Sequence, residues 1–254
     1  MRFKLELLVG FALLATSSCN AETRSAKPFT VSGVVTDTKG RPLEGAEVSL
    51  NADFLYGQAR VTTGADGRYE IGDLIKATYR ATAWIKTDYA DGVVCQRLGM
   101  DRPSDYNSFP VSAGAVRNFR WQLTGEIGAT DTFFGAQVQI WDFDSDVRAK
   151  SRAVEFTLTP SGPLVDGSKG AVIVREAALD HPASDDGIYD IPLGTYRMKA
   201  ELISKDGGRS PATLKGLDAE TYAPEIDLVW QPEARCGFGF DSGVAPFFVQ
   251  IAAP

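Results

Sequence analysis

The acidic stretch WDFDSDV carries carboxylates at alternate positions. Asp142, Asp144 and Asp146 could begin a calcium loop, because hard cations take clustered oxygen ligands. Val147 stands where an EF-hand has its turn glycine, and Ala153 stands where it has a bidentate glutamate. The three aspartates are a candidate calcium site, and the pattern favours the alternative of an exposed acidic turn between strands.

Two tryptophans fall on the polar side of the strands expected to carry them. Trp84 shares a side with Arg80 and Thr82 in TYRATAW, and Trp141 shares one with two glutamines in AQVQIW. An aromatic ring flanked by polar groups suits stacking on a sugar or anchoring a protein contact. The alternative is burial between two modules. Tyrosines in expected loops could extend such a surface, namely Tyr56, Tyr89 and Tyr106.

Catalytic and cofactor chemistry finds little support in the residue types. The single histidine, His181, lies in ALDHPASDD, which is typical of a solvated loop, and no nucleophile motif accompanies it. G-x-S-x-G and glycine-rich phosphate loops are absent, and one histidine cannot furnish a zinc carboxypeptidase site. We expect no catalytic residues and no cofactor, so the chain is not predicted to be an enzyme.

The charge balance limits the classes of partner that the chain is expected to bind. A formal net charge of −7 and a pI near 4.9 argue against nucleic acid, whose phosphates need a basic footprint. The same balance gives no reason to expect electrostatic attraction to anionic lipids.

The N-terminal stretch MRFKLELLVGFALLATSSCNAE is typical of a secretory signal. Arg2 and Lys4 precede an apolar run that is too short to span a bilayer as a stable helix. Small residues before Cys19 resemble a bacterial lipoprotein signal, in which that cysteine becomes the lipidated first residue. The alternative is ordinary cleavage after Ala21 without an anchor. We expect an exported protein at the outer membrane, periplasm or cell surface, with membrane contact only through the lipid.

Cys95 and Cys236 remain after Cys19, one in each half of the chain. In an oxidising compartment they could form a disulfide that joins the halves. The alternative is two small buried hydrophobic residues.

The elements that must position these residues are strands. In AEVSL apolar and polar residues alternate with the period of a half-buried strand, and FTVSGVV with the turn TDTKGRP completes a hairpin. ADGRYEI, TYRATAW and VRNFRWQL continue the pattern. Tyr79, Ala81 and Ala83 stand on the side opposite Trp84, and VRNFRWQL has Phe119, Trp121 and Leu123 on one face. TGEIGATDTFFG is rich in glycine and threonine, and is interpreted as a linker.

The second half repeats the first. GRPLEGAEVSL at 40–50 returns as SGPLVDGSKGAVIV at 161–174, DGRYEI returns as DGIYDI, and ATYR returns as GTYR. AVEFTLT opens this half, with Val154, Phe156 and Leu158 expected to point inward. EIDLVW closes it, with Trp230 on the apolar face. The repeat predicts two related modules, and turns at this spacing predict antiparallel sandwiches. We therefore expect an all-β chain of two tandem antiparallel β-sandwiches. The expected divisions are a signal at 1–21, a short linker at 22–28, and sandwiches at 29–124 and 125–254.

The first block resembles a known family. VSGVVTDTKGRPLEGAEVSL, followed by VTTGADGRYEI, is similar to the carboxypeptidase regulatory-like domain over about residues 29–124. The resemblance implies a transthyretin-like sandwich that accompanies peptidases, outer-membrane receptors and polysaccharide-acting enzymes without being catalytic itself. A related sandwich family forms Lys–Asn isopeptide bonds, but the opening strand here has no lysine.

These observations predict a non-catalytic cell-envelope accessory protein that acts as a binding, docking or spacer module. Its partner would be an envelope protein or a polysaccharide. The alternative is a carbohydrate-binding module that recognises a polysaccharide through Trp84 and Trp141.

Overall fold

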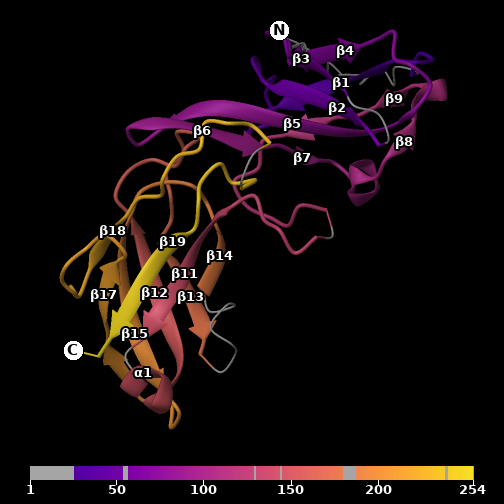
Figure 1. Ribbon diagram of the computed structural model, residues 1–254. Helices are drawn as coiled ribbons and strands as arrows, with labels where there is room; N and C mark the ends of the chain where they lie inside the picture. The colour runs from indigo at the N-terminus through magenta and orange to yellow at the C-terminus, as the bar shows by residue number, and fades with distance from the viewer. Residues whose placement is uncertain are drawn as a thin grey trace, which may run out of the picture.

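The computed structural model describes residues 26–53, 57–128, 130–143, 145–179, 187–237 and 240–253. Strands dominate this part of the chain and form two β-sandwiches in sequence order, as expected for an all-β protein. Figure 1 shows the first sandwich in indigo to magenta and the second in pink, orange and yellow. Within the described residues, no helix combines the length and the apolar character needed to cross a bilayer.

The N-terminal sandwich packs two sheets around one core. One sheet has the order β4-β1-β10-β7, with β9 beside β1, and the other has the order β3-β2-β5-β6, with β8 beside β5. Short 3-10 turns, η1 (Pro103–Tyr106) and η2 (Val111–Ala113), flank β8. The strands are β1 (Val31–Thr36), β2 (Glu47–Ala52), β3 (Gln58–Thr62), β4 (Arg68–Ile71), β5 (Thr78–Tyr89), β6 (Gly92–Arg97), β7 (Gly99–Met100), β8 (Phe109–Pro110), β9 (Ala115–Val116) and β10 (Phe119–Arg120).

The C-terminal sandwich repeats this order, with β19 in the place of both β9 and β10. Its sheets run β14-β11-β19-β17 and β13-β12-β15-β16, with β18 beside β15 as β8 lies beside β5. A short helix, α1 (Ser145–Lys150), links the first two strands. The strands are β11 (Ala136–Phe143), β12 (Ser151–Pro160), β13 (Ile173–Ala178), β14 (Gly187–Ile191), β15 (Tyr196–Ser204), β16 (Arg209–Pro211), β17 (Thr213–Gly216), β18 (Ile226–Leu228) and β19 (Phe247–Ala252).

The described strand pairs are mainly antiparallel, as expected, with parallel exceptions at corresponding places in the two sandwiches. In the first, β1 pairs in parallel with β9 and β10, and in the second, β11 pairs in parallel with β19. In both sandwiches the strand just before this pairing, β8 or β18, belongs to the opposite sheet. The chain then returns to the first sheet and runs beside its first strand in the same direction. Alternation in a sequence indicates which face of a strand is buried, but it does not indicate the direction of the neighbouring strand.

The two similar stretches at 40–50 and 161–174 do not occupy equivalent places in the two sandwiches. The first copy joins β1 to β2, whereas the second joins β12 to β13, so the two copies are one strand out of step. The shorter matches are equivalent, since DGRYEI and DGIYDI give β4 and β14, and ATYR and GTYR begin β5 and β15. The two turns nevertheless meet, because Thr38 Oγ1 donates to Asp166 Oδ2 at 2.7 Å.

The predicted inward faces are buried in both sandwiches. Tyr79, Ala81 and Ala83 of β5 lie in the first core, and Val154, Phe156 and Leu158 of β12 lie in the second. Both sandwiches also bury the tryptophan that ends their apolar pattern, Trp121 and Trp230. Each indole N–H is satisfied inside the protein, by Gln96 Oε1 at 3.1 Å and by the Gln137 carbonyl at 2.8 Å. A buried indole needs such a partner, because an unpaired donor costs free energy.

Buried tyrosines predict a loss of stability in alkali. Burial raises the pKa of Tyr89 and of Tyr196 from 10.0 to about 12, and also raises the pKa of Tyr69. A raised pKa means that the folded state keeps a proton which the unfolded chain releases above pH 10.0. The stabilisation is therefore complete below pH 10.0 and is lost as pH rises toward about 12. Urea titrations across this range should show a falling midpoint, and a midpoint independent of pH would contradict the argument.

Candidate binding surfaces

Several predicted site residues lie outside the described part of the chain. These are Cys19, Tyr56, His181, Asp144 and the side chains of Asp142 and Asp146. The calcium and lipidation hypotheses therefore remain predictions. Among the described residues, no group of three or more His, Cys, Asp or Glu side chains is placed to hold a metal ion.

The two sandwiches are joined at the edge of β6 by a segment that we call the return segment, residues 231–237 and 240–244. In Figure 1 the yellow end of the chain runs up to β6 before it turns back into β19. The amide of Cys95 donates to the Glu233 carbonyl, and the amide of Arg97 donates to the Asp241 carbonyl, both at 2.9 Å. The return segment thus continues the hydrogen bonding of the N-terminal sheet with residues from the C-terminal half.

Side chains reinforce this connection between the sandwiches, which we call the joint and which consists of β6, the return segment and Tyr89. Cys95 of β6 and Cys236 of the return segment form a disulfide, and Arg97 pairs with Asp241 at 3.3 Å. Gly243 has a φ of +79°, and a Cβ there would lie 2.9 Å from the Cys95 carbonyl oxygen. The backbones of the two halves therefore approach closely at this point, and glycine is required both for its conformation and for its lack of a side chain.

Tyr89 also belongs to the joint, although a loop position on a ligand surface was expected. It is the last residue of β5, is 5% exposed and packs in the C-terminal core. Its hydroxyl donates to the Gly194 carbonyl at 3.0 Å and accepts from the Trp230 amide at 3.1 Å. The strand carries Tyr89 beyond its own sandwich, so the ring is buried by the neighbouring module rather than by its own.

The described part of the stretch interpreted as a linker, residues 124–128 and 130–135, is folded against both sandwiches, and a Cβ on Gly128 would lie 3.5 Å from the Tyr106 ring. Ile127 and Phe134 are each 1% exposed. The Asp190 carboxylate of β14 accepts hydrogen bonds from the amides of Gly125 and Gly135, at 2.8 and 3.2 Å. The glycines and threonines of this stretch therefore make a tight connection rather than a loose one.

Tyr106 is half-buried at the end of η1 and does not form an open aromatic surface. Its hydroxyl accepts from the Met100 amide at 2.9 Å, and the Arg97 guanidinium lies 5.9 Å from its ring centroid. The ring therefore supports the packing near the joint.

Trp141 is 61% exposed on the outer face of the sheet β14-β11-β19-β17. Its strand shifts register against β19 between Ile140, opposite Val249, and Asp142, opposite Gln250. Trp141 is therefore the extra residue of a β-bulge, a device that redirects side chains in sheets. The ring of Phe248 meets it edge-on at a centroid distance of 5.4 Å and fixes one side of the indole.

A line of side chains extends from Trp141 across the same face, and we call it the Trp141 row. It consists of Trp141, Gln250 of β19, Lys215 of β17 and Tyr222. Lys215 lies opposite Gln250 in the ladder, and its ammonium is 5.0 Å from the Tyr222 ring centroid. Tyr222 itself is 43% exposed. Tyr222 stands next to β17, because its neighbour Ala223 forms a bridge with Leu214. The row therefore crosses three strand spacings, about 14 Å, and has an exposed aromatic ring at each end.

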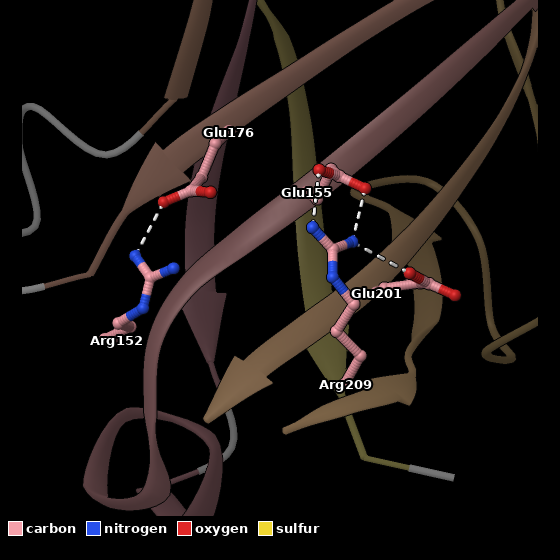
Figure 2. Close-up of polar contacts among 5 residues, drawn as sticks. All are labelled: Arg152, Glu155, Glu176, Glu201 and Arg209. Atoms are coloured by element: carbon pink, nitrogen blue, oxygen red, sulfur yellow. Dashed lines mark hydrogen bonds and ion pairs between the residues drawn. The ribbon is translucent and has the colours of Figure 1, made fainter. Parts of the chain in front are cut away.

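The outer face of the other C-terminal sheet has a different character, as Figure 2 shows. Arg209 donates to Glu155 at 2.5 and 3.0 Å and to Glu201 at 3.1 Å, and Arg152 donates to Glu176 at 2.8 Å. The Arg209 guanidinium holds the pKa of Glu155 below its usual range. These charges are matched within the sheet, as expected of a solvated surface. The aromatic and amide groups are concentrated on the Trp141 face instead.

Trp84 lies in a second setting, a cleft on the outer face of β2, β3 and β5. It is half-buried, and Gly237 of the return segment lies beside its ring. The cleft measures about 380 Å³. Its lining is otherwise polar and comprises Glu47, Ser49, Asn51, Gln58, Arg60 and Thr82, together with Cys236 and Gly237. The cleft thus combines a face of the N-terminal sheet with a wall from the C-terminal half.

Sequence alternation placed Trp84 and Trp141 on outer faces, but it missed most of their neighbours. Phe248, Lys215 and Tyr222 reach Trp141 only through pairing of β11, β19 and β17. Gln250 stands on an alternating strand, but the sequence does not indicate which strand lies beside it. In the return segment, Cys236 was the one residue that the sequence linked to the N-terminal half. The sequence left open whether it bonds to Cys95 or whether both cysteines are small buried residues.

Comparison with known proteins gives a match to one family model over the first sandwich, and low similarity to solved structures over most of the chain. The Bacillus anthracis TIE protein is 12% identical with a TM-score of 0.31, over 89% of this chain and 34% of that one. A C-terminal fragment of the pilus adhesin SpaC from Lactobacillus rhamnosus GG is 14% identical with a TM-score of 0.28, over 89% and 97%. The minor pilin GBS52 of Streptococcus agalactiae is 13% identical with a TM-score of 0.26, over 89% and 96%.

No curated protein matches the chain. Residues 30–120, which form the N-terminal sandwich, match the family model of the carboxypeptidase regulatory-like domain, and this confirms the resemblance found in the sequence.

Proposed function

We propose that this protein is an exported, non-catalytic accessory module of a bacterial cell envelope, anchored through lipid at Cys19. It holds two sandwiches as one stiff spacer and presents a docking surface for an envelope protein. The disulfide supports export, since such bonds persist in oxidising compartments. Metabolic labelling with a fatty-acid analogue tests the anchor, and retention of the label by Cys19→Ser would contradict it.

The joint is the observation that carries the spacer role. Domains within one chain move relative to each other by default unless their interface is large and apolar. Here a disulfide, two backbone hydrogen bonds at 2.9 Å and the buried Tyr89 together oppose such movement. A module joined in this way keeps the outer face that carries Trp84 and the outer face that carries Trp141 at a fixed separation and orientation.

Docking is tested by photo-cross-linking in intact cells. A photoreactive residue at position 141 should give a discrete cross-linked product, whereas the same residue at position 201, in the charge-paired face, should not. Equal products from both positions, or none from position 141, would count against a docking surface at the Trp141 row. Scattering profiles of the purified chain should also fit a single rigid shape.

Carbohydrate binding is the second candidate function, and the Trp141 row favours it. Exposed rings at both ends of a polar row can stack on two units of an extended polysaccharide, while Gln250 and Lys215 donate to hydroxyl groups. Such a row would bind a chain laid across the strands.

Replacing Trp141 by alanine is expected to abolish this binding and leave the fold intact. Because the ring is 61% exposed, the free energy of unfolding should change by no more than about 0.5 kcal/mol. Affinity electrophoresis in gels that contain envelope or plant polysaccharides measures the binding, and urea titration measures the stability. Val174→Ala, at an exposed apolar residue on β13, is the matched control and should retain the native mobility shift. An unshifted native protein across the panel would leave docking as the better account.

A further inference from the structure

We propose that the cleft beside Trp84 is a binding site for a single neutral pyranose unit, and that the Cys95–Cys236 disulfide holds the site closed. The site is separate from the Trp141 row, because it lies on the N-terminal sandwich and shares no residue with that row. The proposal therefore stands whether or not the row binds a polysaccharide.

The lining of the cleft matches the two sides of a sugar ring. A pyranose has an apolar face of C–H groups and a rim of hydroxyl groups that both donate and accept. Trp84 offers the aromatic surface, while carboxylate, amide, hydroxyl and guanidinium groups surround the rest of the cleft. A volume of about 380 Å³ lies at the lower end of the range of small-molecule sites, which suits a ligand of a single ring.

The polar groups are arranged in rows by the sheet. Glu47 lies opposite Trp84 across β2 and β5, and in the next row Ser49 lies between Arg60 and Thr82. Side chains directly opposite each other in adjacent strands stand within contact distance on one face. The hydrogen-bonding groups therefore stand beside the ring on rigid strands, as a pre-organised site requires.

Arg60 is held in place before any ligand arrives. Its guanidinium lies 3.1 Å from the Glu47 carboxylate, and its Nε–H donates to Gln58 Oε1. The Arg60–Glu47 ion pair balances the positive charge of Arg60, while the cleft still has groups that can donate and accept hydrogen bonds. This charge balance favours a neutral sugar over an anionic one, whose carboxylate or phosphate would compete with Glu47.

The last wall belongs to the other half of the protein. Cys236 and Gly237 border the cleft, and a Cβ on Gly237 would lie 3.6 Å from the Trp84 ring. Gly237 has a φ of +70°, a conformation that glycine adopts without strain. Because the disulfide fixes Cys236 to Cys95 of β6, removal of the bond frees this wall and opens the cleft on one side.

The experiment uses the full oxidised chain and a panel of methyl glycosides of glucose, galactose, mannose and N-acetylglucosamine. Saturation-transfer NMR and calorimetry should detect saturable binding of at least one glycoside. Trp84→Ala should weaken that binding by about tenfold or more, the range of an aromatic hot spot. Trp84→Phe, which keeps a ring, should weaken it less. The double variant Cys95→Ser/Cys236→Ser should also bind more weakly, because the wall is released.

Two controls separate this site from the Trp141 row. Trp141→Ala should bind the glycosides as the native chain does, and circular dichroism should show that every variant is folded at the temperature of the binding assay. The proposal is overturned if the folded native chain binds none of the glycosides, or if Trp84→Ala binds them unchanged. Binding that is lost in Trp141→Ala and kept in Trp84→Ala would support the second candidate function and reject the cleft.

Discussion

A chain with both Cys95 and Cys236 replaced by serine is expected to lose about 3–5 kcal/mol of unfolding free energy. The bond closes a loop with a sequence separation of 141 residues, so it removes much conformational freedom from the unfolded chain. It also secures the return segment, whose hydrogen bonds to β6 lie at the edge of the N-terminal sheet. Urea titration should show the loss, and the transition should broaden if the two sandwiches begin to unfold separately.

Reductant provides the matched control for this variant. Native protein treated with reductant should approach the stability of the double serine variant, while the variant itself should not respond to the treatment. A loss below about 1 kcal/mol, smaller than most native disulfides contribute, would mean that the joint is held by its noncovalent contacts alone.

Trp230→Ala is expected to destabilise the C-terminal sandwich by about 3–5 kcal/mol, the range for large aromatic residues in cores. Trp230 is 1% exposed and packs edge-on against Tyr196 at a centroid distance of 6.1 Å. The substitution would leave a cavity and deprive the Gln137 carbonyl of its indole donor. Because Tyr89 accepts from the Trp230 backbone amide, the damage should extend to the joint.

Trp230→Phe separates packing from hydrogen bonding. It keeps a ring against Tyr196 but lacks the N–H, so a smaller loss of about 1–3 kcal/mol is expected. Denaturation monitored by circular dichroism compares the two variants. If alanine and phenylalanine proved equally harmful, the indole hydrogen bond would outweigh the packing, and the cavity argument would be wrong.

The sequence predicted those parts of the fold that depend on neighbours along the chain. Alternation placed Val154, Phe156 and Leu158 inside and Trp141 outside, because side chains on a strand point to opposite faces in turn. The motif in residues 29–124 predicted a carboxypeptidase regulatory-like sandwich, and the family model matches residues 30–120.

What escaped prediction depends on contacts between distant segments. Tyr89 looked like a loop residue because its burial comes from Gly194 and Trp230, more than 100 positions away. The parallel neighbours β1 and β10 have no local signature, since direction depends on the path between them. The partners of Trp84 in its cleft come from three strands and the return segment, so alternation could name the tryptophan but not the site.

The position of the disulfide also determines how far the protein could stretch under load. If the chain were pulled from its ends, tension would pass directly from residue 95 to residue 236 through the sulfur atoms. The 141-residue separation that the bond closes could not be drawn out, although as an extended chain it would add about 480 Å. Most of the C-terminal sandwich lies inside this protected loop. While the bond is oxidised, force could extend only the segments outside the loop, which include β1 to β5 and β19. Reduction would release the residues inside it as well.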